Sequence, residues 1–269
     1  MERLDKVLIE KVKGKLLNAD EFTGLKTGFK GIDSLTNGFA NGQLIVMGGR
    51  PGMGKTTFAC SLIDNVCFHD NKSCIYCSLE MSKEQAVAKF LLMHANIKYY
   101  EKGMDEIIYR LADSAADLEK SKLRIDTGYA CDCEEFIDSC KSVGKKGRVD
   151  LIIVDYLELL GNDKAYLSKI LLGLKELAEE LDCPVLVLSQ LKRTVEYRED
   201  HMPCIDDFAH AQIVGKYADE ILLLYREAYY DPDADRSKAV IKLARHKYLW
   251  NMNIPMRFDT EVFAFRDNE

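Results

Sequence analysis

One short segment constrains the fold of this 269-residue chain more than any other. The segment "GGRPGMGKTT", Gly48 to Thr57, follows the apolar run "LIVM" and precedes a stretch with helical periodicity. Residues 49–56 fit the spacing G-x-x-x-x-G-K-[ST], in which glycines bring backbone N–H groups close to an anion and a helix N-terminus adds partial positive charge. A strand, a glycine-rich turn and a helix in this order predict a cradle for nucleotide phosphates.

The polar residues of this loop predict both nucleotide and metal binding. The Lys55 side chain is placed to reach the β- and γ-phosphates, and the Thr56 hydroxyl is placed to bind Mg²⁺. We therefore expect ATP and Mg²⁺ as ligands. The predicted nucleotide-binding residues are Gly49, Arg50, Pro51, Gly52, Met53, Gly54, Lys55, Thr56 and Thr57.

The composition is that of a globular protein, with 47% apolar and 30% charged residues. No apolar run approaches the roughly 18 residues of a membrane span, and the charged N-terminus lacks the features of a signal peptide. We therefore expect a cytoplasmic protein without a membrane partner. The net charge of −7 argues against a surface coated with basic residues, although it leaves room for a local basic channel.

The nine cysteines predict reduced thiols. Cys74 and Cys77 form a C-x-x-C pair, but a three-residue offset along a strand places side chains on opposite faces. Cys131 and Cys133 have no second cluster of ligands, which argues against a zinc site. Buried thiols are therefore expected rather than a redox pair or a metal site.

Apolar strand patterns alternate with helical periods from Phe29 onward, which predicts an α/β fold with a mainly parallel, twisted sheet and helices on both faces. The segments "KAVIKLARHKYLW" and "NIPMRFDTEVFAFRD" alternate as short strands, so antiparallel pairs are expected at the C-terminal end. The expected strands are 44–48, 73–78, 123–126, 151–155, 184–189 and 221–225, and the expected helices are 55–69, 82–95, 105–119, 132–143, 165–182 and 207–217.

Three polar residues follow the apolar strands at positions suited to catalysis. Asp155 ends "LIIVD" and would hold the metal, Glu80 follows "IYCSL" and would activate water, and Gln190 ends "VLVLSQ" and would report on the γ-phosphate. Each residue also has a purely structural interpretation, as a cap, a carboxylate at a helix N-terminus and a turn residue, respectively. Their shared position at strand ends beside one phosphate loop favours the catalytic interpretation.

In this order the motifs resemble the ATPase domain of DnaB-type replicative helicases, within the RecA-like ATPases. The resemblance runs from about Thr23 to Phe265 and is carried by "TGLKTGFKGIDSLTNGFANGQLIVMGGRPGMGKTTFA", "SLEMS", "LIIVDYLELL", "LKELAEELDCPVLVLSQLKRTVEYR" and "YADEILLLYRE". It implies that Glu80 matches the family's catalytic glutamate, Asp155 its metal-linked aspartate and Gln190 its γ-phosphate sensor. It also implies a hexameric ring that hydrolyses ATP between subunits around single-stranded DNA, with replication proteins as further partners.

Residues 1–18 carry an apolar stripe typical of an amphipathic helix, at Leu4, Leu8, Val12 and Leu16. Such a helix packs either on its own domain or on a neighbouring subunit, and the resemblance favours the second as a linker arm. The expected division is an arm at 1–20 and a RecA-like ATPase domain at 21–269. The family's preceding helical domain has no counterpart here, so we expect a natural short member or an excised domain.

Two departures from the family pattern affect the expected trans-acting and DNA-binding residues. Arg245 stands at the family's lysine position and Lys247 at its arginine finger; if one strand carried both, both cations would lie on one face. The family's DNA-contacting loop is replaced by residues 209–212, "AHAQ", which lack its arginine and glycine. The candidate DNA-binding residues are then Lys192, Arg193 and Arg198, although a salt-bridged surface loop explains them equally well.

Two functions from different classes remain open on the sequence alone. The first is an ATP-dependent DNA helicase or translocase with Lys55, Glu80, Asp155, Gln190, Arg245 and Lys247 as catalytic residues. The alternative is a RecA-like ATPase repurposed as a protein-directed switch or loader, which unwinds DNA weakly or not at all. A nucleotide-binding protein without turnover is disfavoured by the intact catalytic set.

Overall fold

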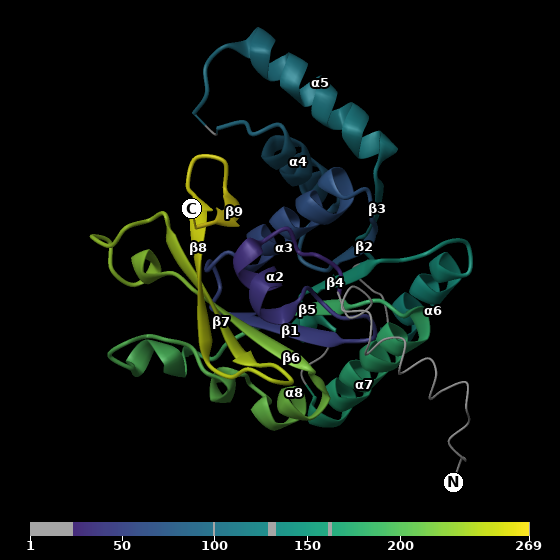
Figure 1. Ribbon diagram of the computed structural model, residues 1–269, viewed down its shortest axis with the longest axis vertical. Coiled ribbons are helices and arrows are strands. Elements are labelled where there is room, and N and C mark those ends of the chain that lie inside the picture. The colour runs from purple at the N-terminus through teal and green to yellow at the C-terminus, as the bar shows by residue number, and fades with distance from the viewer. Residues whose placement is uncertain (1–23, 99, 129–132, 161–162, 269) are drawn as a thin grey trace.

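The computed structural model describes residues 24–268 apart from 99, 129–132 and 161–162, so the arm predicted at 1–20 lies outside the described residues. The chain forms a nine-stranded sheet in the order β3-β2-β4-β5-β1-β6-β7-β8-β9 (Figure 1). The strands are β1 Leu44–Gly49, β2 Ser73–Ser78, β3 Lys122–Asp126, β4 Leu151–Asp155, β5 Val185–Gln190, β6 Glu220–Tyr225, β7 Lys238–Arg245, β8 Met252–Asp259 and β9 Ala264–Asp267.

The first six strands are parallel and the last three are antiparallel, as the sequence predicts. Four strands, β1, β2, β4 and β5, are buried almost throughout. Helices cover both faces of the sheet at these strands, so continuous apolar runs such as "LIVM" are shielded from water on both sides. β8 instead alternates exposed and buried residues, which is the pattern of a strand with one solvated face.

The helices agree with the predicted ranges except at three places. They are α2 Lys30–Thr36, α3 Lys55–Ile63, α4 Lys83–His94, α5 Met104–Lys120, α6 Cys133–Gly144, α7 Lys164–Leu181 and α8 Ala211–Tyr217. The short α2 was not predicted, and the helix expected over 55–69 continues beyond Ile63 as a π-helix, Asp64–His69.

The helix expected over 207–217 begins only at Ala211, so its predicted start is wrong. Asp207 belongs to a separate 3-10 turn, Ile205–Asp207, and its carboxylate accepts hydrogen bonds from the Cys204 N–H and the Arg198 guanidinium. These bonds fix the chain in a turn before the helix starts.

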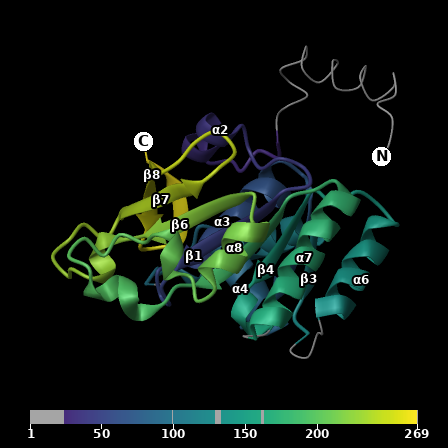
Figure 2. The same ribbon diagram turned by 90° about the horizontal axis from the view of Figure 1, so that it is seen from below.

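Two apolar layers cover the sheet. One layer joins the sheet to α2, α3 and α4 and contains Cys74, and the other joins it to α6, α7 and α8 and contains Cys77. The two cysteines therefore lie on opposite faces, as the strand offset predicts, and the eight described cysteines are free. Figure 2 shows α7 and α8 against one side of the sheet.

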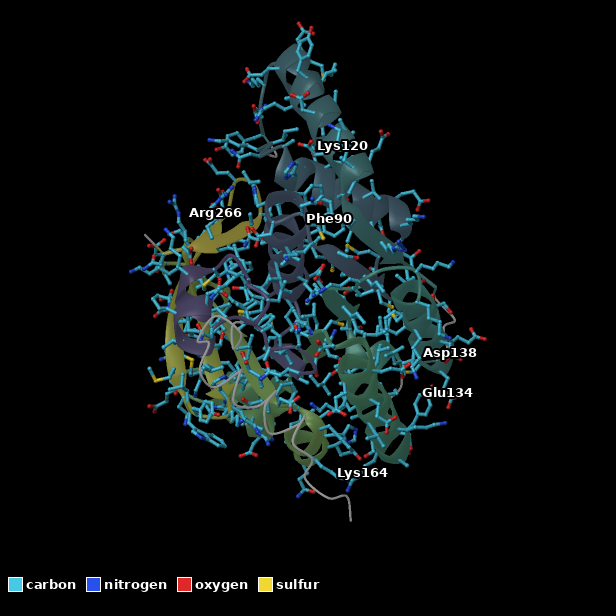
Figure 3. All side chains as sticks on the ribbon, turned by 45° about the vertical axis from the view of Figure 1, so that its right-hand side comes forward. Phe90, Lys120, Glu134, Asp138, Lys164 and Arg266 are labelled. Carbon is cyan, nitrogen blue, oxygen red and sulfur yellow. The ribbon has the colours of Figure 1, made fainter. Side chains whose placement is uncertain are left out.

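The surface helices follow their amphipathic sequences. On α6 the solvent face carries Glu134 and Asp138 while Phe136 and Cys140 are buried, and Figure 3 shows both acidic side chains at the outer edge of the molecule. Phe90 of α4 lies deep in the core in the same view. In the described part of the chain no helix is long and apolar enough to cross a bilayer.

Candidate nucleotide site

The register of the parallel strands brings the predicted catalytic residues to one edge of the sheet. Gly49 at the end of β1 pairs with Gln190 at the end of β5, and Asp155 at the end of β4 pairs with Ser78 at the end of β2. Glu80 follows two residues later, and the Leu79 N–H donates to the Asp155 carbonyl at 2.8 Å. The carboxyl edge of the sheet therefore gathers the phosphate loop, a metal-type carboxylate and two polar side chains.

The phosphate loop needs glycine at two positions of positive φ. Gly52 has φ +76° and Gly54, which precedes α3, has φ +108°, and a Cβ on Gly54 would lie 3.1 Å from the Phe265 ring. Other residues adopt such conformations only with strain. The loop can therefore close around an anion at the N-terminus of α3.

Lys55 is buried at the start of α3, and its ammonium lies within the phosphate loop. Nζ donates to the carbonyls of Gly49 at 2.8 Å and Arg50 at 3.3 Å. Burial lowers the pKa of Lys55 to about 8, although the carboxylates of Asp155, Glu158 and Glu80 oppose the shift. A desolvated ammonium with two carbonyl partners gains from a phosphate that restores full ion pairing.

Asp155 is almost completely buried, and the Tyr76 hydroxyl donates to its Oδ2 at 2.9 Å. Burial raises the pKa of Asp155, and hydrogen bonds from Thr56 and Tyr76 act in the opposite direction. Among the described residues no cluster of three or more His, Cys, Asp or Glu side chains could hold a metal by itself. Mg²⁺ commonly binds through one or two carboxylates together with substrate phosphates, so Asp155 beside Thr56 is a suitable donor set.

Glu80 is exposed beside this carboxylate and acts electrostatically on both Lys55 and Asp155. Gln190 is half-buried, and its side chain forms a hydrogen bond with Tyr156. A solvent-facing carboxylate and an amide at the sheet edge that carries the phosphate loop have the chemistry to orient water and to contact a γ-phosphate.

Glu158 is a site residue that the sequence analysis missed. One oxygen, Oε1, accepts hydrogen bonds from the Ser189 hydroxyl at 2.5 Å and the Gln190 N–H at 3.0 Å. Among the described residues its other oxygen, Oε2, is buried without a hydrogen-bond partner. Burial raises the pKa of Glu158, while the bonds to Ser189 and Gln190 and the nearby Lys55 oppose the shift. The signal was the charged residue in the apolar string "DYLELL".

Arg245 and Lys247 lie far along the sheet from their own phosphate loop. Arg245 ends β7 opposite Ile221, near the start of β6, whereas the other end of β6 lies at the edge that carries the loop. The Arg245 guanidinium donates to the Gly215 carbonyl of α8. The expectation that one strand carries both cations is wrong, because β7 ends at Arg245 and Lys247 lies in the following turn. Lys247 is exposed, and its ammonium lies 5.1 Å from the centre of the Tyr248 ring.

The candidate DNA-binding residues lie on the post-β5 segment, residues 191–198. Lys192 and Arg193 are exposed, and within the described chain their side chains have neither an ion pair nor a hydrogen bond. Arg198 instead forms a bidentate ion pair with Asp207, with nitrogen–oxygen distances of 2.8 and 2.6 Å. The acidic Glu196 contacts Arg50 rather than the neighbouring cations.

The chain is similar to known proteins in sequence and in fold. The sequence model of the DnaB-like helicase C-terminal domain matches residues 24–267. Replicative DNA helicases DnaB from Geobacillus stearothermophilus and Rickettsia bellii are 32% and 35% identical over 82% and 88% of this chain. The chain spans about half the length of these relatives, 51% and 52%.

Two solved structures have closely similar folds. One is described as an ATPase domain and superposes with a TM-score of 0.89 at 25% identity, and all of both chains is covered. A DnaB-like replicative helicase, described with its interactions with primase, superposes with a TM-score of 0.88 at 26% identity over 100% of this chain and 68% of that one.

Proposed function

We propose that this chain, which belongs to the DnaB-like helicase C-terminal domain family, is the ATP-driven motor of a DNA helicase or translocase. The observation that carries the proposal is the meeting of Lys55, Asp155 and Gln190 at one sheet edge, with Glu80 beside them. A binding protein without turnover has no need of a carboxylate facing solvent beside a metal-type aspartate.

Each residue then has a defined part in hydrolysis. Backbone N–H groups of residues 49–57, except Pro51, which has none, and the Lys55 ammonium would hold the triphosphate, and Thr56 and Asp155 would hold the metal. Mg²⁺, when bound, neutralises phosphate charge in the transition state. Glu80 orients and deprotonates water, and Gln190 contacts the γ-phosphate.

We further propose that the site is completed by a second copy of the chain in a ring. The position of Arg245 supports this, because its strand end lies away from its own phosphate loop. Without a large rearrangement, a cation at this position can reach the nucleotide of another subunit but not that of its own subunit. Lys247 extends from the adjoining turn and supplies a second, more mobile charge. A hexamer is the assembly that the family resemblance favours, with residues 1–20 as the connecting arm.

Single-stranded DNA is the proposed substrate for movement, and Lys192 and Arg193 are the proposed contacts. Both are exposed and unpaired in the described chain, and the highly exposed Tyr197 offers a ring for base stacking. Arg198 contributes less, since Asp207 occupies its guanidinium. Replacing Lys192 or Arg193 with alanine should reduce the slope of log K for DNA binding against log salt concentration by about one unit for each residue.

Primase and other replication proteins are proposed partners, because a structural neighbour is described with primase. A cytoplasmic location is proposed on the ground of the buried, free cysteines.

The testing experiment measures ATP hydrolysis with and without single-stranded DNA at low salt, using Lys55→Ala as the control. Stimulation by DNA that disappears in the variant supports the motor. Turnover that ignores DNA would favour a protein-directed switch, and no phosphate release at all would overturn the assignment of an ATPase.

A further inference from the structure

A single side chain connects the phosphate loop to the post-β5 segment. The Arg50 guanidinium reaches out of the loop and donates to the Glu196 carboxylate, with Nε–Oε1 2.8 Å and Nη2–Oε1 2.7 Å. Its Nη1 donates to the Leu191 carbonyl at 2.7 Å. Arg50 therefore contacts both the beginning and the middle of the segment that carries Lys192 and Arg193.

This ion pair is partly withdrawn from water. The Arg50 side chain is 9% exposed and that of Glu196 is 34% exposed, so the pair is screened less than one on the open surface. Loss of Glu196 would leave a buried guanidinium with one carbonyl as its remaining described partner. The position of the segment and the conformation of residue 50 are therefore coupled energetically.

Lys55 extends this connection to the phosphates. Its ammonium donates to the carbonyl of Arg50 itself, as well as to that of Gly49. The two carbonyls occupy two of the three ammonium donors, so an ammonium that turns to donate more than one hydrogen bond to a bound phosphate gives up at least one carbonyl. Phosphate binding in the loop therefore affects the hydrogen bond to the carbonyl of Arg50, whose side chain holds Glu196.

Glu196 lies inside the 3-10 helix Arg193–Tyr197, which begins and ends with two of the exposed side chains proposed to contact DNA. This short helix is anchored at two points, because Val195 is buried and the Lys192 N–H is held by the Asp207 carbonyl at 2.8 Å. The Arg50–Glu196 ion pair is a further contact that holds this helix in place.

We propose that the Arg50–Glu196 pair couples phosphate occupancy to the placement of the post-β5 segment, with Glu196 as its positioning residue. The proposal rests on the proposed function, since it deepens the link between nucleotide and DNA. It assigns to Arg50 a role through its side chain that the phosphate-loop pattern gives only to backbone groups.

The test is hydrogen–deuterium exchange of the full chain with and without a slowly hydrolysed ATP analogue and Mg²⁺. Wild type, Glu196→Ala, Glu196→Gln and Glu199→Ala are compared. Glu199 is the matched control, because it is exposed, lies in the same loop and is unpaired among the described residues. Its replacement removes the same charge without touching Arg50.

We expect nucleotide to change exchange over 191–198 in wild type and Glu199→Ala, and to leave it unchanged in Glu196→Ala. Glu196→Gln, which keeps an acceptor oxygen, should retain part of the response. Protection over 48–57 should appear in every variant. Two outcomes would overturn the proposed coupling but not the proposed nucleotide site. One is a response over 191–198 that persists in Glu196→Ala, and the other is a response that is missing in wild type despite protection over 48–57. Missing protection over 48–57 would overturn the proposed nucleotide site and the link together.

Affinity for single-stranded oligonucleotide gives a second readout. Coupling between two sites typically amounts to about 5–150-fold in affinity. We expect nucleotide to change DNA affinity by a factor in that range in wild type and Glu199→Ala, and by less than about twofold in Glu196→Ala. Equal factors in the two alanine variants would contradict the proposal.

Discussion

At the scale of single residues, the site depends on charges held out of water. Lys55, Asp155 and Glu158 are all largely buried within one short stretch of sheet edge, and the lysine and the two carboxylates oppose one another's burial-driven pKa shifts. Glu158 adds a positional role, because one of its oxygens fixes the Ser189 hydroxyl and the main chain of Gln190. Side chains outside the familiar phosphate-loop pattern therefore help to position Gln190, the proposed γ-phosphate sensor.

Glu158→Ala should lower kcat for ATP hydrolysis by about ten- to a hundredfold, because small displacements of a catalytic group cost rates of that order. Glu158→Gln, which still offers an acceptor oxygen to Ser189 and Gln190, should stay within about threefold of wild type. Steady-state kinetics with a thermal-unfolding control distinguishes loss of positioning from loss of fold. An unchanged kcat in Glu158→Ala would remove this role.

Glu220 is a buried residue with a measurable cost to stability. In the described structure neither carboxylate oxygen has a hydrogen-bond partner, and burial, followed by the charge of Asp219, raises the pKa of Glu220 from 4.5 to about 8. The folded state therefore holds a proton that the unfolded state loses above pH 4.5. The contribution of Glu220 to the free energy of unfolding should therefore be highest below pH 4.5 and should fall as the pH rises to about 8.

Glu220→Leu should therefore raise the melting temperature more at pH 8 than at pH 5. The gain in the free energy of unfolding that the substitution brings should be larger at pH 8 than at pH 5 by on the order of 3–5 kcal/mol. Glu220→Gln should flatten the pH dependence in the same way, and Glu227→Gln, an exposed carboxylate, is the control. Thermal melts across this pH range measure the effect, and identical pH profiles for Glu220→Gln and wild type would contradict it.

At the scale of elements, local signals define the helices that frame the site. α4 begins with a capping box in which the Gln85 N–H donates to the Ser82 hydroxyl at 3.3 Å and the Ser82 N–H donates to the Gln85 side chain at 2.9 Å. This cap fixes the start of α4 at Lys83, three residues after Glu80. By contrast, the turn before α8 depends on an ion pair of Asp207 with Arg198, nine residues earlier in the chain, which no capping pattern at the turn predicts.

Ser82→Ala should destabilise the protein by about 1 kcal/mol, the usual cost of losing a cap. Ser139→Ala, at an exposed position inside α6, should be neutral or slightly stabilising, since alanine is the better helix former. Urea denaturation of both variants measures the difference. Equal stabilities would show that the box contributes nothing to the start of α4.

At the scale of the whole molecule, the sheet separates the two halves of the proposed site. The phosphate loop lies at one edge, and Arg245 lies where β7 ends opposite the start of β6. In the proposed ring, a complete site would combine Lys55 from one copy with Arg245 from another. Activity should therefore depend on protein concentration as the assembly forms.

Mixing two inactive variants tests this arrangement. Lys55→Ala and Arg245→Ala should each lack activity, but a one-to-one mixture should recover up to roughly a quarter of wild-type hydrolysis, the share of interfaces that receive both intact residues. Hydrolysis assays after co-assembly measure the recovery. A mixture as inactive as its parts, although assembled, would argue for action of Arg245 within its own subunit.

The sequence by itself determined the phosphate loop, the parallel direction of the first strands and the antiparallel end, because these depend on local backbone chemistry and on hydrophobic periodicity. It also placed Asp155, Glu80 and Gln190 at strand ends, since each ends or follows an apolar run. These features need no knowledge of distant contacts.

Only the tertiary structure decided which charges meet. In the sequence Glu196 lies close to Lys192 and Arg193, whereas the fold pairs it with Arg50, 146 residues away in the chain. It likewise pairs Arg198 with Asp207, aims Glu158 at β5 and ends β7 before Lys247. Ion pairs between segments far apart in sequence are set by how strands order in the sheet, and no local pattern of residues encodes that order.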